Sequence, residues 1–74
     1  MELSAQKKVQ AGISFHKNGK LKKAEVLYRN ALKINPNHPD ANHNLGILSV
    51  SINKNKEALN FFKVALEANP KMEQ

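Results

Sequence analysis

The sequence has no cysteine and no tryptophan, and it is poor in acidic residues. Without cysteine, neither a disulfide nor a thiolate metal site can hold the fold together. Only three prolines and three glycines interrupt the 74 residues, and 41% of the residues are hydrophobic, which is typical of a globular chain. No apolar run approaches the roughly 20 residues that span a bilayer, and the first residues do not resemble a secretory signal. We therefore expect one small cytoplasmic domain over residues 1–74, with no membrane segment.

The basic residues are unevenly placed along the chain. The net charge is +6. Residues 1–38 hold eight Lys or Arg against two Glu, whereas residues 39–74 hold four basic and four acidic residues. A track for phosphates would favour Arg, and single-stranded nucleic acid would require exposed aromatic rings, but there is one Arg and the four aromatic residues are needed for packing. We therefore expect no nucleic-acid partner, and interpret the lysines around residues 17–23 as solvated helix ends or as a patch for an acidic protein.

The chain repeats itself with a period of 34 residues. Residues 5–38 and 39–72 align without a gap. The identical pairs are Gly12/Gly46, Ile13/Ile47, Lys20/Lys54, Lys22/Lys56, Ala24/Ala58, Ala31/Ala65, Leu32/Leu66, Asn35/Asn69 and Pro36/Pro70. Because the matches fall on small, apolar and proline positions, we interpret the two segments as two structural repeats.

Each repeat has the pattern of two helices joined by a short turn. Ser4 can cap a first helix, which Asn18 and Gly19 end. A second helix is predicted over residues 21–34, where apolar residues recur with helical spacing. In the second repeat, Pro39 opens a helix that extends to about residue 52, and residues 57–68 form the last one. The chain is therefore predicted to be all-α, with four helices and no strand.

The repeat resembles the tetratricopeptide repeat family. The length fits, and so does the order of small, aromatic and proline positions. The matching positions are Ala11, Gly12, Phe15, Ala24, Tyr28, Ala31 and Pro36 in the first repeat, and Leu45, Gly46, Ala58, Phe62, Ala65 and Pro70 in the second. The resemblance implies an α-solenoid of two antiparallel helix-turn-helix repeats (5–38 and 39–72). The resemblance also implies that Gly12 and Gly46 are glycine because two helices cross closely at these positions.

The chain also departs from the family pattern. Lys8 and Asn42 stand where a large residue is common, and Ser49 stands where an aromatic is expected, which indicates looser packing of the first helix of the second repeat. The family usually has three or more repeats, so the last helix is expected to lack part of its cover at Leu59, Phe62 and Leu66. We therefore expect the chain to be part of a longer protein, or to form a homo-oligomer through this open end.

The resemblance also implies a binding surface. In this family the first helices of successive repeats line a concave face that binds extended peptides or helices. The corresponding residues here are Gln6, Val9, Gln10, Ile13, His16, Lys17, Asp40, His43, Asn44, Ile47, Val50 and Ser51. In relatives attached to protein glycosyltransferases an Asn at the place of Asn44 holds peptide backbone, whereas Gln10 occupies that place in the first repeat. The apolar members either form a groove for an apolar or amphipathic peptide, or merely pack between neighbouring helices.

The sequence contains no arrangement of residues that indicates catalysis. His16, His38 and His43 are not expected to converge on a metal, no serine has a neighbouring base, and no glycine-rich phosphate loop is present. We therefore expect a non-enzymatic scaffold for protein–protein interaction, without cofactor or metal. The alternatives are self-association through the open end, and a substrate-recruiting arm of a larger glycosyltransferase, sulfotransferase or methyltransferase.

Overall fold

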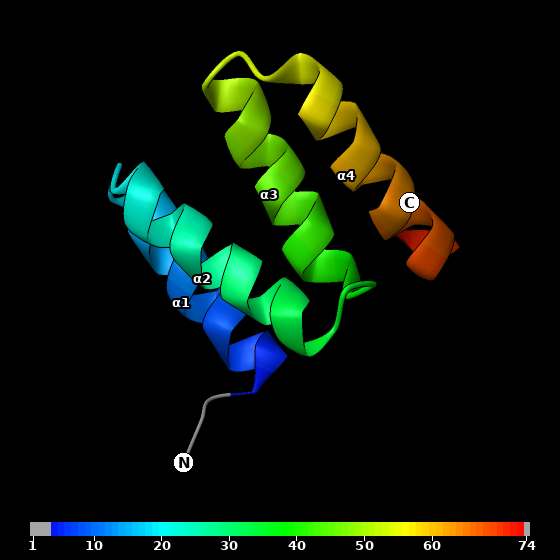
Figure 1. The fold of residues 1–74 in the computed structure, drawn as a ribbon, viewed down its shortest axis with the longest axis horizontal. Helices are drawn as coiled ribbons and strands as arrows, with labels where there is room; N and C mark the ends of the chain where they lie inside the picture. The colour runs from blue at the N-terminus through cyan, green and yellow to red at the C-terminus, as the bar shows by residue number, and fades with distance from the viewer. Residues whose placement is uncertain (1–3, 74) are drawn as a thin grey trace.

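Four helices in two antiparallel pairs make up the fold. The computed structural model describes residues 4–73. Its elements are α1 (Ala5–Lys17), α2 (Leu21–Ile34), α3 (Pro39–Ser51), α4 (Asn55–Ala68) and a terminal 3-10 helix, η1 (Pro70–Glu73). Figure 1 shows the pair α1/α2 lying beside the pair α3/α4. The prediction of an all-α fold with four helices is confirmed, although the last helix begins at Asn55 rather than at residue 57. None of the helices within residues 4–73 is long and apolar enough to cross a membrane.

The helix ends follow from local chemistry. The Oγ of Ser4 accepts a hydrogen bond from the backbone N–H of Lys7 at 3.2 Å, which caps α1 as predicted. Gly19 and Asn53 have positive φ angles of 76° and 63°. They are 34 residues apart, so the first helix of each pair ends at the same left-handed turn.

Two glycines allow the helices within each pair to approach closely. A Cβ atom built on Gly12 would lie 2.6 Å from Cε1 of Tyr28, and one built on Gly46 would lie 2.6 Å from Cε1 of Phe62. Real Cβ atoms do not approach a ring this closely, so only glycine fits. The expectation that these glycines mark a close helix crossing is confirmed.

The third helix is the centre of the molecule. α3 packs against α1, α2 and α4, whereas α1 and α4 do not pack against each other. Six residues of α3 are buried, compared with three each in α1 and α2. Its fully buried leucines, Leu45 and Leu48, join Tyr28 of α2 and Val9 of α1 in one core.

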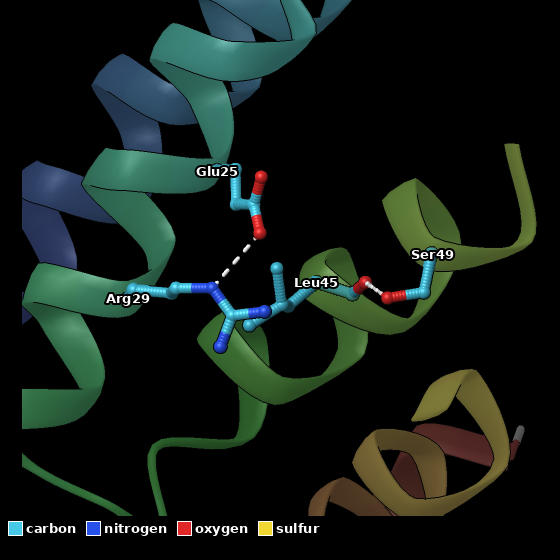
Figure 2. Close-up of polar contacts among 4 residues, drawn as sticks. All are labelled: Glu25, Arg29, Leu45 and Ser49. Carbon is cyan, nitrogen blue, oxygen red and sulfur yellow. Dashed lines mark hydrogen bonds and ion pairs between the residues drawn. The ribbon is translucent and has the colours of Figure 1, made fainter. Parts of the chain in front are cut away.

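Two polar residues of α3 are buried and satisfied. The side-chain amide of Asn42 donates to the carbonyl oxygens of Pro36 at 3.1 Å and His38 at 3.0 Å, which ties the loop between the pairs to α3. The Oγ of Ser49 donates to the carbonyl of Leu45 at 2.8 Å (Figure 2). The looser packing expected from Asn42 and Ser49 is therefore not found, because both side chains are only 3% and 2% exposed.

The outer surface of α4 is open. Leu59 is 72% exposed and Leu66 is 36% exposed. Phe62 is half-buried, whereas Tyr28, at the same position of the first repeat, is completely buried. The prediction that the last helix lacks cover is confirmed for Leu59 and Leu66.

Candidate peptide-binding face

The helices that carry the predicted binding residues lie against each other. Six of these residues belong to α1 and six to α3, and the two helices are in contact. We call this surface the α1–α3 face. Its residues are Gln6, Val9, Gln10, Ile13, His16, Lys17, Asp40, His43, Asn44, Ile47, Val50 and Ser51.

The four apolar members of the α1–α3 face differ in exposure. Val9 is completely buried in the core, and Ile13 is half-buried and packs against the core. Ile47 and Val50 are 40% and 49% exposed. They are three residues apart on α3 and so lie on one side of that helix. Val9 therefore packs between helices, whereas Ile47 and Val50 expose apolar surface to solvent.

The polar members of the face keep free hydrogen-bonding capacity. Nδ2 of Asn44 donates to the carbonyl of Asp40 at 2.8 Å, which uses one of its two N–H groups. Its second N–H and its amide oxygen make no hydrogen bond to another described residue beyond that one. Gln6, Gln10 and Lys17 are exposed. Asn44 can therefore still bind a peptide group, with its side chain oriented by Asp40.

Both histidines of the face pack on the aromatic ring of their own repeat. Nδ1 of His16 lies 3.2 Å from the hydroxyl of Tyr28. Burial raises the pKa of the Tyr28 phenol, so the hydroxyl stays protonated. It can therefore donate a hydrogen bond to the imidazole of His16. The ring of His43 lies 5.7 Å from the ring of Phe62, measured between centroids. These histidines connect the α1–α3 face to the interior of each pair.

The third histidine has a structural position that the sequence analysis did not identify. Nδ1 of His38 accepts a hydrogen bond from the backbone N–H of Ala41 at 3.2 Å and so caps α3. Asn42 was likewise missed as the residue that secures the loop. The sequence does contain a signal for this role, because Asn42 lies one helical turn after His38 and six residues after Pro36, within reach of both carbonyl groups. Across the residues that the structure describes, no group of three or more His, Cys, Asp or Glu could hold a metal ion.

Comparison with known proteins agrees with this arrangement. A family model described as tetratricopeptide repeat matches residues 15–74. None of the curated proteins with which the chain was compared matches it. The match covers α2, α3 and α4 and the last residues of α1, and it includes Gly46 and the buried residues Tyr28, Leu45 and Leu48. By its sequence and by its paired helices, the chain belongs to the tetratricopeptide repeat family.

Proposed function

We propose that the chain is an interaction scaffold that binds an apolar or amphipathic peptide on the α1–α3 face. Members of its family serve in general as protein–protein interaction modules and are typically non-catalytic. The observation that carries the proposal is the exposure of Ile47 and Val50 on one side of α3. Apolar surface next to free amide groups suits a ligand that presents both hydrophobic side chains and peptide backbone.

The peptide can be found by selection and its site tested by substitution. A displayed library of random peptides is selected on the immobilised chain, and the Kd of a selected peptide is measured by calorimetry. Ile47→Lys should weaken binding by about tenfold or more, because it replaces apolar contact with a charge. Ile34→Lys is the matched control, since Ile34 is 49% exposed but lies on α2. Equal effects of the two substitutions, or selection of no peptide, would contradict the proposal.

Self-association through α4 is a second candidate, supported by the 72% exposure of Leu59. An isolated leucine on a surface is ordinary, but Leu59, Leu66 and half-buried Phe62 lie on the last α-helix of the described residues, which only the short η1 follows. Two copies that covered these side chains would remove them from water.

Light scattering tests this second candidate. The mass of the purified chain should rise with concentration above that of one chain, and Leu59→Glu should return it to one chain. Lys56→Glu is the control for the change of charge, because Lys56 is also an exposed residue of α4. A constant monomeric mass at millimolar concentration would rule out association.

A further inference from the structure

The apolar residues on the outer side of α4 form one stripe. Leu59, Phe62 and Leu66 have the spacing i, i+3 and i+7, which places them on one side of a helix. Leu59 is 72% exposed and Leu66 is 36% exposed, whereas Phe62 is half-buried. We call these three residues the α4 stripe. Beside Leu59 lies a shallow depression of about 400 Å³, which an apolar side chain of another molecule can enter.

The corresponding residues of α2 show what the junction between the two repeats contains. A shift of 34 residues takes the α4 stripe to Glu25, Tyr28 and Leu32. Glu25 binds Arg29 at 2.9 Å (Figure 2). The Arg29 guanidinium lies 5.9 Å from the centre of the Phe61 ring, which belongs to the second repeat. An ion pair therefore occupies the junction at this place.

The α4 stripe is more apolar than the surface of α2 on which the second repeat stacks. Leu59 stands where Glu25 forms its ion pair, and it is the most exposed of the large hydrophobic residues in the described part of the chain. A further repeat that stacked on α4 as α3 stacks on α2 would not require a leucine at this position. The exposed Leu59 therefore indicates a contact of another geometry.

The outer side of α1 does not suit the α4 stripe of a second copy. Ala41 and Leu48 of α3 are buried in the core that α3 shares with α1 and α2. The corresponding residues of α1 are Lys7 and Ser14, and both are exposed. Stacking α4 of one copy on α1 of another would bury a lysine and a serine against apolar side chains, which costs free energy. A head-to-tail arrangement of copies is therefore disfavoured.

The distribution of charge favours a contact between two α4 helices. The charged residues of α4 are Lys56, Glu57, Lys63 and Glu67, so this helix has no net charge. Residues 1–38 hold the whole net charge of +6. Because α1 and α4 do not pack against each other, a contact through α4 joins neutral surfaces and leaves the two basic repeats on the outside.

We propose that two copies of the chain pair back to back through their α4 stripes around a two-fold axis. In such a contact each copy uses the same surface, so the pair is closed and no further copy adds through α4. The leucines of one copy contact those of the other, which removes both sets from water. This inference rests on the self-association proposed above and specifies its geometry. Since the stripe shares no residue with the α1–α3 face, each pair presents that face twice.

The mass at saturation tests whether the pair is closed. Sedimentation equilibrium of the 74-residue chain should give a mass that rises with concentration and levels off at twice 8.3 kDa. A head-to-tail contact leaves a binding surface free at each end, so its mass would keep rising. Growth beyond two chains would overturn the two-fold geometry but not self-association. A constant mass of one chain at millimolar concentration would overturn both.

Charge substitutions at the two ends of the molecule identify the surfaces that meet. Leu59→Glu should weaken the pair by about tenfold or more, because it places a charge in an apolar contact. Ser14→Glu is the matched control on α1 and should leave the Kd of the pair unchanged. Both sites are exposed, so circular dichroism should show an intact fold. Equal weakening by the two substitutions would place α1 in the contact and overturn the proposal.

Because the chain has no cysteine, a single introduced thiol reports which surfaces lie together. Lys63→Cys places a thiol beside the α4 stripe, and Ser14→Cys places one on α1. A flexible bis-maleimide should link Lys63→Cys chains to each other about tenfold faster than Ser14→Cys chains, because the pair raises the effective concentration of one thiol near the other. In an equimolar mixture, preferential links between Lys63→Cys and Ser14→Cys would reveal a head-to-tail contact instead.

Discussion

Tyr28→Ala should lower the free energy of unfolding by more than Phe62→Ala does. Tyr28 is completely buried and lies against Gly12, so its loss opens a cavity in the core. Truncation of a buried aromatic residue costs about 3–5 kcal/mol. A domain of this length has a total stability of about 4–11 kcal/mol, so this loss is a large fraction of the total.

Phe62 is the matched comparison because it has the same position in the second repeat. It is only half-buried, so its truncation should cost less, about 1–3 kcal/mol. Urea unfolding followed by circular dichroism measures both losses. Tyr28→Phe separates the ring from the hydroxyl, which lies 3.2 Å from Nδ1 of His16, and should cost about 0.5–1.5 kcal/mol. Equal losses for Tyr28→Ala and Phe62→Ala would contradict the burial described here.

Gly12→Ala should destabilise the chain although alanine is the better helix former. Within a helix the exchange normally gains about 1 kcal/mol. Here the new Cβ would lie 2.6 Å from Cε1 and 2.8 Å from Cδ1 of Tyr28, a ring that the core holds on all sides. Overpacking of this kind costs about 1–3 kcal/mol, so we expect a net loss in the free energy of unfolding.

Gly46→Ala tests the cause of that loss. The Cβ meets the ring of Phe62 at the same distance of 2.6 Å, but this ring is half-buried and can move towards solvent. The loss should therefore be smaller than for Gly12→Ala, and thermal unfolding measures both. Ser14→Ala, at an exposed site of α1, should be neutral or slightly stabilising. A stabilising Gly12→Ala would show that the helices are not held at this crossing.

The fold could be predicted because its determinants are local and occur twice. The positions of Gly12 and Gly46, and the prolines that follow each second helix, establish the period and the helix ends without any knowledge of distant contacts. The bounds of α2 agree with the prediction. The beginning of α4 does not, because the exposed residues Asn55 and Lys56 carry no strong helix signal in the sequence.

The candidate site was predictable only in part, because burial depends on neighbouring helices. The sequence pattern assigns Val9, Ile47 and Val50 to one predicted face, yet Val9 is completely buried and the other two are exposed. The weaker burial of Phe62 than of Tyr28 agrees with the prediction that the last helix lacks part of its cover. The difference arises because Tyr28 lies in a pair that has a neighbouring pair on its outer side, and Phe62 does not.

Because α3 is the central helix, the helices should differ in how easily their backbone amides become exposed by local unfolding. Hydrogen exchange reports the free energy of the smallest opening that exposes an amide, and that free energy follows local burial. Amides of α3 are covered by three helices, whereas α4 packs on α3 and on the short η1. We therefore expect the amides of α4 to exchange before those of α3, with the strongest protection around Leu45 and Leu48.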